Sequence, residues 1–321
     1  MKAYLGIDVG SVSINIVVLS EAGEVMTGLY LRTKGRPIEV IQEGLKQTAD
    51  SIPPDVTIAG VGSTGSGRYL AGIMVGADVI KNEITAHAVA ASMVIPDVQT
   101  VFEIGGQDSK IIILRHGIVT DFAMNTVCAA GTGSFLDQQA SRLNIPISQF
   151  GELALQSRSQ VRIAGRCTVF AESDMIHKQQ MGHQIPDIIN GLCEALVRNY
   201  LNNVGKGKEI QPPIAFQGGV AANVGIKDAF EKALELPIII PKYFNIMGAI
   251  GAAQIACEEV DRKGETSFKG FKITDMPYRT GSFECDGCSN ACEVVEIYEE
   301  SRVIGRWGSR CAKWDIIGEN K

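Results

Sequence analysis

The sequence lacks the features that mark membrane, secreted and nucleic-acid-binding proteins. It contains no apolar run long enough to span a membrane, and Met1 is followed directly by the strand pattern AYLGIDV rather than by a signal-peptide pattern. The net charge of −6 gives no reason to expect nucleic-acid binding. We therefore expect a cytoplasmic protein that binds neither a membrane nor nucleic acid.

Histidine is also scarce. The four histidines share no common spacing with the cysteines, so the sequence does not indicate a mononuclear metal site built on histidine. The order of residues supports no Ser–His–Asp arrangement either. If this protein carries chemistry, glycine turns and cysteines are the better candidates.

Cysteine is present eight times, yet disulfides are not expected, because the cytosol keeps thiols reduced. Cys193 and Cys257 stand in apolar helical patterns and are interpreted as buried packing residues. The remaining six need another explanation. They are Cys128, Cys167 and a cluster in the last forty residues, Cys285, Cys288, Cys292 and Cys311.

The length of 321 residues allows two domains, and a hydrophobic content of 45% with 21% charged residues is typical of a globular protein. The pattern strand, glycine turn, strand occurs in AYLGIDVGSVSINIVVL and again in TVFEIGGQDSKIIIL. Two copies of one design predict a duplicated α/β architecture with a cleft between the halves. Helices are expected over residues 37–50 and 69–94, the second with a polar interruption at KNEITAH, and a linker over 261–277.

Glycine turns provide the candidate nucleotide site. Backbone N–H groups of a glycine turn can face phosphate oxygens, and Asp8 at a strand end is placed to hold Mg²⁺ through water. GSTGSGR at residues 62–68 is a further glycine turn, and each turn alone is also compatible with a plain structural connection. The candidate nucleotide-binding residues are Gly10, Ser11, Val12, Gly105, Gly106, Gly218, Gly219 and Asn223, with Glu103, Gln107 and Asp108 as polar ends of the second turn.

Cys128 and Cys167 each stand before a segment that is predicted to begin a helix. A thiolate there would lie near free N–H groups and the positive end of a helix dipole, which favours anionic ligands such as an iron–sulfur cluster. Two thiols cannot complete a four-cysteine cluster, but a symmetric dimer would supply two from each subunit. The alternative is that both are packing or mildly reactive cysteines.

The tail has the spacing C-x2-C-x3-C-x18-C, formed by Cys285, Cys288, Cys292 and Cys311. Four thiols make a complete tetrahedral set, and a short polar tail has little core without a metal. The sequence therefore predicts a metal site in the tail. It leaves open whether the metal is zinc or a second [4Fe–4S] cluster.

Together the glycine turns resemble those of the actin, heat-shock-chaperone and sugar-kinase superfamily, in which two ribonuclease-H-like domains clamp ATP. MGAIGAA at 247–253 corresponds to a hinge helix of that group. The motifs GIDVGS, EIGGQDSK, MNTVCAAGTGSF, CTVFAESD and GGVAAN are similar to those of a narrower family. These are the ATP-dependent activators of 2-hydroxyacyl-CoA dehydratases, with the ATPase subunits of benzoyl-CoA reductase and the reductases of double-cubane iron–sulfur proteins.

This resemblance, over roughly residues 3–256, implies a homodimer that holds one [4Fe–4S] cluster between its subunits, with Cys128 and Cys167 as ligands. It implies that ATP, ADP and Mg²⁺ act at the glycine turns and that hydrolysis moves the helices that carry the cluster. It implies electron transfer from a ferredoxin or flavodoxin to a dehydratase, a reductase or a double-cubane protein. A small-molecule kinase of the same superfamily and a nucleotide-sensing scaffold with a zinc tail remain alternatives.

Two residues depart from the family pattern. Asn15 stands where the family commonly has a lysine, and Glu103 stands where it has an aspartate. Gln107 and Asp108 are retained and are the preferred groups for positioning the attacking water. The expected division is residues 1–90 and 91–260 for the two ATPase domains, the second carrying Cys128 and Cys167, and 261–321 for the linker and tail.

Overall fold

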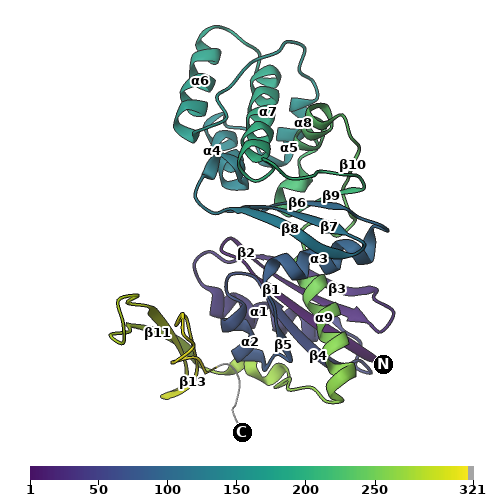
Figure 1. Cartoon of the computed structure of the whole chain (residues 1–321), viewed down its shortest axis with the longest axis vertical. Helices are drawn as coiled ribbons and strands as arrows, with labels where there is room; N and C mark the ends of the chain where they lie inside the picture. Colours follow the sequence, from purple (N-terminus) through teal and green to yellow (C-terminus); the bar gives the residue numbers. More distant parts are fainter. Residues whose placement is uncertain (317–321) are drawn as a thin grey trace. The chain divides into compact units, whose positions relative to one another are not determined.

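The computed structural model describes residues 1–316, which form two compact units. Unit 1 comprises Met1–Val89 together with the chain from Gly248 onward, and unit 2 comprises Ala90–Met247. Each unit is built on its own five-stranded sheet, and a third sheet of three strands belongs to unit 1 (Figure 1). The predicted duplicated α/β architecture is thereby confirmed.

The sheet of unit 1 has the order β3-β2-β1-β4-β5, with β1, β2 and β3 antiparallel and β4 and β5 parallel to β1. Helices α1 and α2 pack on one face, where alternate residues of β1 such as Leu5 and Ile7 are fully buried. The bounds are β1 Lys2–Val9, β2 Ser13–Ser20, β3 Val25–Arg32, β4 Thr57–Thr64, β5 Val79–Ile80, α1 Pro37–Ser51 and α2 Arg68–Val75.

Helix α9 (Met247–Lys263) covers the opposite face at unusually close range, because glycines on β1 and β4 leave room for its backbone. A methyl group at Gly6 would come within 1.9 Å of the Ala249 carbonyl oxygen, and one at Gly62 within 2.1 Å of that of Ala252. In the same way, Gly251 lets α9 approach Ala86 of α3 (Glu83–Val94). The small residues of MGAIGAA thus serve close packing.

The sheet of unit 2 repeats the strand order of unit 1: β10-β9-β6-β7-β8, with β9 and β10 parallel to β6. Its helices pack over one face in Figure 1, around an aromatic cluster of Phe102, Tyr200, Phe216 and Phe230. The bounds are β6 Thr100–Ile104, β7 Ser109–Arg115, β8 Ile118–Asn125, β9 Ile214–Gln217, β10 Ile238–Ile239, α4 Gly133–Arg142, α5 Ile147–Ala154, α6 Thr168–Gln180, α7 Ile185–Asn203 and α8 Val224–Leu234.

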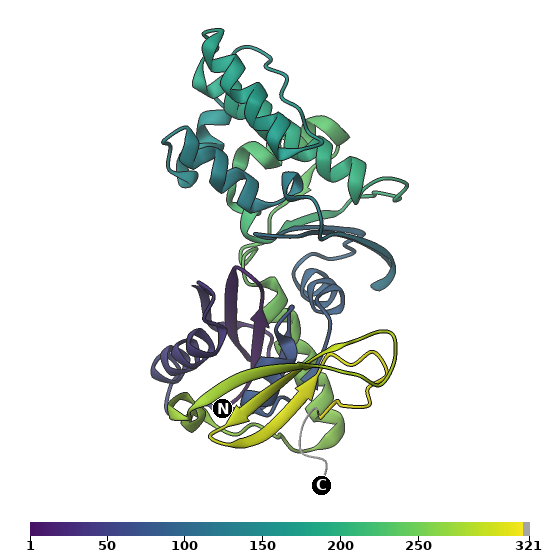
Figure 2. The ribbon, with the colours of Figure 1, turned by 90° about the vertical axis from the view of Figure 1, so that its left-hand side faces the viewer.

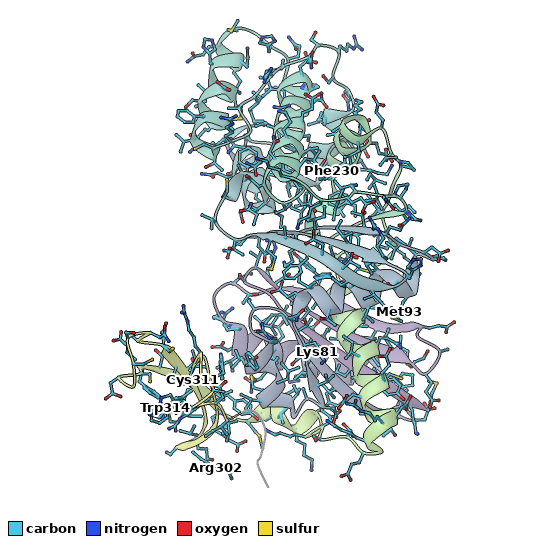
Figure 3. All side chains as sticks on the ribbon, in the orientation of Figure 1. Lys81, Met93, Phe230, Arg302, Cys311 and Trp314 are labelled. Atoms are coloured by element: carbon cyan, nitrogen blue, oxygen red, sulfur yellow. The ribbon has the colours of Figure 1, made fainter. Side chains whose placement is uncertain are left out.

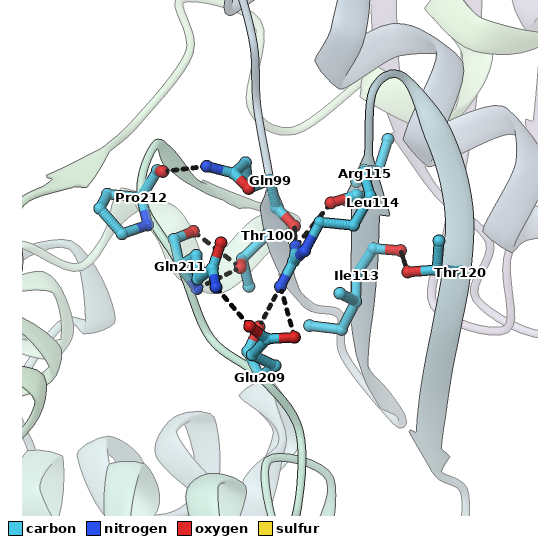
Figure 4. Close-up of polar contacts among 9 residues, drawn as sticks. All are labelled: Gln99, Thr100, Ile113, Leu114, Arg115, Thr120, Glu209, Gln211 and Pro212. Atoms are coloured by element: carbon cyan, nitrogen blue, oxygen red, sulfur yellow. Dashed lines mark hydrogen bonds and ion pairs between the residues drawn. The ribbon is translucent and has the colours of Figure 1, made fainter.

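A polar network fixes the segment that leads into β9. Arg115 donates to the backbone oxygens of Gln99 and Glu209, and Thr100 exchanges hydrogen bonds with Gln211 (Figure 4). A cis peptide bond joins Pro212 to Pro213 in this segment. These bonds hold the entry of β9 beside β6 and β7, the strands on either side of the second glycine turn.

The tail packs on unit 1. Its strands β11 (Tyr278–Glu284), β12 (Glu293–Glu299) and β13 (Arg302–Trp307) form an antiparallel sheet, seen broadside in Figure 2. Ile297 is fully buried in the core of unit 1. Ile73 of α2 would collide with any side chain at Gly305, and the Trp307 ring stacks on Tyr69, which is also on α2.

Three expectations about elements and boundaries need correction. Residues 69–94 are not one helix: Gly76, in the left-handed conformation at φ 70°, ends α2, β5 follows, and Asn82 accepts the Thr85 N–H at the start of α3. Residues 248–260 belong to unit 1 rather than unit 2, because α9 packs on β1 and β4. Segment 261–277 is no free linker, since Phe268, Phe271 and Ile273 pack on the unit 1 core. Helix η3 (Phe271–Asp275) lies within it.

None of the helices in the described residues 1–316 is both long and apolar enough to cross a membrane.

Candidate functional site

In unit 1 the first glycine turn closes tightly at the end of β1. The Gly10 N–H donates to the Ser13 oxygen at 2.9 Å, and Ser11 is exposed while Val12 is half-buried. The later turn GSTGSGR joins it, because the Gly67 N–H and the Ser66 hydroxyl both donate to the Val9 oxygen. Two glycine turns distant in sequence therefore meet at one strand end, beside Asp8.

Asp8 has oxygen-bearing neighbours on both adjacent strands. In the register of the sheet it stands opposite Asn15 of β2 and beside Thr64 of β4. The side-chain oxygens of Asn15 and Thr64 are buried and have no hydrogen-bond partner. Carboxylate, amide and hydroxyl oxygens are ligands that a hard cation such as Mg²⁺ accepts, directly or through water. This donor set, which includes Asn15, fits the predicted Mg²⁺; Thr64 carried no signal in the sequence.

The space around Asp8 depends on glycine. A methyl group at Gly248 would lie 2.3 Å from one carboxylate oxygen of Asp8, and one at Gly65, where φ is +90°, would lie 2.5 Å from the other. The same methyl group at Gly248 would lie 3.3 Å from Nε2 of His87. Gly248 of α9 and Gly65 of the loop before α2 thus leave space around the Asp8 carboxylate.

In unit 2 the second glycine turn joins β6 to β7, and the Gly105 N–H donates to the Asp108 oxygen. Lys110, only 2% exposed, lies with its ammonium nitrogen 2.9 Å from carboxylate oxygens of both Glu103 and Asp108. A buried ammonium group needs carboxylate partners, and removing one member of a buried ion pair leaves the charge of the other uncompensated. Lys110 therefore fixes both carboxylates, and its only signal in the sequence is a lysine within an apolar strand. Gln107 is exposed.

The glycine turn that follows β9, with Gly218, Gly219 and Asn223, lies against the second glycine turn. Gly218 has φ +88°, and a methyl group there would meet the Ile104 backbone oxygen at 2.5 Å and a Glu103 carboxylate oxygen at 2.6 Å. Gly219 opens the short 3-10 helix η2 (Gly219–Ala222). Asn223 caps α8 through its Oδ1, which accepts the N–H groups of Gly225 and Ile226. Its buried Nδ2 has no partner and stays a candidate donor to a nucleotide.

Cys128 and Cys167 lie close together in unit 2. The Cys128 thiol lies 3.8 Å from the backbone oxygen of Arg166, the residue before Cys167. Asn199 of α7 links the two loops: its Nδ2 donates to the Gly165 oxygen and lies 3.8 Å from the Cys128 sulfur. Cys167 directly precedes α6, as predicted, whereas Cys128 precedes only the 3-10 turn η1 (Ala129–Gly131).

The surroundings of the two thiols are exposed and apolar. Val127 is 95% exposed, and Val169 and Phe170 of α6 are 65% and 66% exposed. Asn125 holds the Cys128 loop by accepting its N–H and donating to its oxygen. Two half-exposed thiols on such a surface fit a cluster whose other two ligands come from a second molecule.

The second glycine turn is bonded to the helix that follows Cys128. The N–H groups of Gly133 and Ser134, the first residues of α4, donate to the oxygens of Gly105 and Gly106 at 2.9 Å each. The Ser134 hydroxyl also donates to the Gly106 oxygen. Arg142 at the end of α4 pairs with Glu172 of α6 at 3.0 Å. Hydrogen bonds therefore connect the second glycine turn to α4, and an ion pair connects α4 to α6.

The remaining cysteines divide into two groups. Cys193 is fully buried, and burial raises the pKa of its thiol, which confirms its packing role. Cys257 is half-exposed on α9, so the expectation that it is buried was wrong. In the tail, the backbone N–H of Gly287 and the indole of Trp314 hold the pKa of Cys285 below its ordinary value.

Comparison with known proteins accords with this geometry. The family model described as the BadF/BadG/BcrA/BcrD ATPase family matches residues 5–256. The (R)-2-hydroxyglutaryl-CoA dehydratase activating ATPase of Acidaminococcus fermentans is 38% identical over 267 residues, which are 80% of this chain and 98% of the relative. The cysteine-rich tail lies beyond the residues that the family model matches.

Two solved structures resemble the chain in three dimensions. The activator of 2-hydroxyisocaproyl-CoA dehydratase from Clostridium difficile, with bound ADPNP, gives a TM-score of 0.74 at 30% identity and covers 82% of this chain and 97% of that one. Component A of the (R)-2-hydroxyglutaryl-CoA dehydratase of Acidaminococcus fermentans also gives 0.74, at 35% identity over 81% and 100%. The two large sheets are those of the actin-like ATPase fold.

Proposed function

Because the chain belongs to the BadF/BadG/BcrA/BcrD ATPase family, we propose that it is an ATP-driven electron donor to a partner iron–sulfur enzyme. The partner is a 2-hydroxyacyl-CoA dehydratase, a related reductase or a double-cubane protein, and the electron comes from a ferredoxin or flavodoxin. The observation that carries this proposal is the juxtaposition of Cys128 and Cys167 on an exposed apolar surface.

Each chain of a homodimer contributes Cys128 and Cys167 to one [4Fe–4S] cluster, which supplies a one-electron site when bound. Asn125 and Asn199 orient the loop of Cys128, and Asn199 ties it to the loop that leads to Cys167. Exposed Val127 and Phe170 provide apolar surface for the second subunit. Burying that surface would also shield the thiolates from water.

At the nucleotide, Asp8 would hold Mg²⁺ with the help of the oxygens of Asn15 and Thr64. The N–H of Gly10 closes the turn on the Ser13 oxygen, and the N–H groups of Ser11 and Val12 face phosphate oxygens. In unit 2, Gly105 and Gly106 contact phosphate, and Gln107 and Asp108 position the attacking water. Gly218, Gly219 and Asn223 receive the adenosine. Lys110 pairs with Asp108 and Glu103 and holds both carboxylates in place.

Nucleotide state reaches the cysteines through α4. ATP can drive electron transfer only if its binding favours one conformation of the cysteine region over another. Bonds from Gly105 and Gly106 to Gly133 and Ser134 provide that connection within unit 2. A phosphate that pulls on the turn moves α4 as a rigid lever, and the Arg142–Glu172 pair passes the motion to α6.

The proposal is tested on protein purified without oxygen. We expect about two iron and two sulfide per chain, a dimeric mass, and Mg-ATP-dependent electron delivery from dithionite-reduced protein to a 2-hydroxyacyl-CoA dehydratase. ADP formation should not depend on added sugar or acetate. Iron near zero in such protein, or a sugar-dependent ATPase, would replace the electron donor with a small-molecule kinase.

Removing the Ser134 hydroxyl should weaken the coupling. One lost hydrogen bond is worth about 1 kcal/mol, so Ser134→Ala should raise the ATP consumed per electron transferred by about fivefold. Iron content and nucleotide affinity should stay unchanged, because the backbone bonds of Gly133 and Ser134 remain. Ser141→Ala, at an exposed serine on the same helix, is the matched control. An unchanged ratio in Ser134→Ala would remove this contact from the coupling path.

A further inference from the structure

The antiparallel order of the tail sheet brings its four cysteines to one end. β11 ends at Glu284 and β12 begins at Glu293, so the loop that holds Cys285, Cys288 and Cys292 joins them there. β13 runs back along β12 and ends at Trp307, just before Cys311. Figure 3 shows Cys311 and Trp314 together in the tail, away from Arg302, where β13 begins.

Cys285 and Cys292 face each other across the first two strands. Cys285 follows Glu284 and Cys292 precedes Glu293, the last pair of the ladder, and the Cys285 N–H donates to the Cys292 oxygen at 2.8 Å. Side chains at directly opposite positions have Cβ atoms about 4.5–5.5 Å apart. That separation suits two sulfurs on a single metal ion, since a Zn–S bond of about 2.3 Å in a tetrahedron places its sulfurs roughly 3.8 Å apart.

The chain around Cys311 lies against this pair. Gly308 follows β13 with its backbone close to that of Glu293, the neighbour of Cys292. Three residues beyond Cys311, the indole N–H of Trp314 donates to the Cys285 sulfur at 3.2 Å. The second segment is therefore folded back over the first, although about twenty residues separate them in sequence.

The turns at the cysteines are held in unfavourable backbone conformations. Ala291, just before Cys292, has φ 42°, and Ala312, just after Cys311, has φ 56°. Residues with a Cβ atom avoid this region, and strain of this kind persists where the surroundings enforce it. A ligand that ties these turns together would account for it.

From these observations we propose that Cys285, Cys288, Cys292 and Cys311 bind one divalent metal ion of the zinc class as a tetrathiolate. Binding releases four thiol protons and leaves a site of net charge −2. Hydrogen bonds to Cys285 from Gly287 and Trp314, with Lys313 nearby, offset that charge. A cubane puts each thiolate on a different iron, whereas a single zinc ion takes all four thiolates, as the cross-strand placement of Cys285 and Cys292 allows.

Binding requires a rearrangement of the cysteine side chains. In the described residues no three His, Cys, Asp or Glu side chains already lie close enough to hold an ion. Cys288 and Cys311 are exposed, so their side chains turn inward from solvent rather than out of a core. The sheet itself, which the metal closes at one end, is already docked on α2 by Ile297, Gly305 and Trp307.

The metal site has a consequence for unit 1. Helix α2, on which the tail sheet packs, begins at Arg68, immediately after the glycine turn that lies beside Asp8. A tail sheet whose end is held together by the metal would restrict the movement of α2 and of the glycine turn before it. The site is independent of the proposed electron transfer, because none of its ligands takes part in the central cysteine pair.

The test is the metal content of full-length protein purified without oxygen or chelator, with zinc and iron measured separately. We expect about one zinc per chain. Cys292→Ser and Cys311→Ser should each lose it and keep the iron of the central pair, whereas Cys257→Ser, at a half-exposed cysteine on α9, should keep both. Wild-type protein that contains zinc but no iron would contradict only the cluster proposed at Cys128 and Cys167. The two proposals therefore fail separately.

A second readout guards against variants that misfold. Both tryptophans of the chain, Trp307 and Trp314, lie in the tail, so intrinsic tryptophan fluorescence reports on this module. Stripping the metal from wild-type protein should shift the emission, and added Zn²⁺ should restore it. About six iron per chain, four of them lost in Cys292→Ser, would show a cubane and overturn the zinc assignment. Neither metal in the tail, with all four thiols open to alkylation, would overturn the site.

Discussion

Cys128→Ala should lower the iron content of anaerobically purified protein about tenfold or more while leaving ATP binding within about twofold of the wild type. The thiol is half-exposed, and its contacts with the Arg166 oxygen and with Asn199 are 3.8 Å long. Its removal therefore costs the fold little, whereas a cluster with two thiols from each subunit would lose two ligands per dimer. Iron analysis and nucleotide titration of the same sample measure both effects.

The same variant should separate dimerisation from folding. If the shared cluster holds the subunits together, Cys128→Ala should shift the native mass towards that of a monomer while thermal unfolding stays close to the wild type. Cys257→Ala provides the matched control, because Cys257 is also half-exposed but lies on α9 of unit 1. A Cys128→Ala protein that kept its full iron and its dimeric mass would end the bridging assignment.

Features that depend on neighbouring residues were predictable from the sequence. Strand, glycine turn and strand in GIDVGS and EIGGQDSK are local patterns, and they gave the two sheets and the turns at their strand ends. The helix before which Cys167 stands was predictable for the same reason. The two-residue strand β5 was not, because only its pairing with β4 distinguishes it from the helical pattern around it.

Features that depend on long-range packing escaped prediction. Glycines on β1 and β4 allow α9 to pack closely on unit 1. The domain boundary expected near residue 260 therefore could not be placed correctly from the sequence of α9 alone. The tail was expected to follow a linker, yet Phe268 and Ile273 anchor the chain before it and Ile297 anchors its sheet. An apolar residue indicates that its side chain will be buried, but it does not indicate which element the side chain will pack against.

The contacts of the candidate site residues escaped prediction for the same reason. Asn15 and Thr64 gain meaning only from a register that sets them on either side of Asp8, and Asn199 only from a long helix that passes both cysteine loops. Lys110 is the exception that had a signal: a lysine among the isoleucines of β7 is costly unless a carboxylate lies near. Buried charge in an apolar strand is thus a usable indicator of a site.

Asp8→Ala should reduce Mg-dependent ATP hydrolysis by about a hundredfold or more and leave iron content unchanged. A metal ion at a phosphoryl group contributes several kcal/mol to the transition state, and about 3 kcal/mol corresponds to a hundredfold in rate. Asp8 supplies the only carboxylate of the trio that it forms with Asn15 and Thr64 in the described sheet of unit 1. The measurement is ADP formation over a range of Mg²⁺ concentrations. Asp50→Asn, at the exposed end of α1, is the control.

Gly248→Ala tests the same carboxylate without removing it. The added methyl group would stand 2.3 Å from an Asp8 oxygen, so the carboxylate must turn away from its position beside Asn15 and Thr64. Hydrolysis should fall in this variant too, and raised Mg²⁺ should restore it in part, because the ligand is displaced rather than lost. Asp8→Ala should not respond to added Mg²⁺ in that way. Full activity in both variants would remove Asp8 from the nucleotide site, and the metal would then need other ligands.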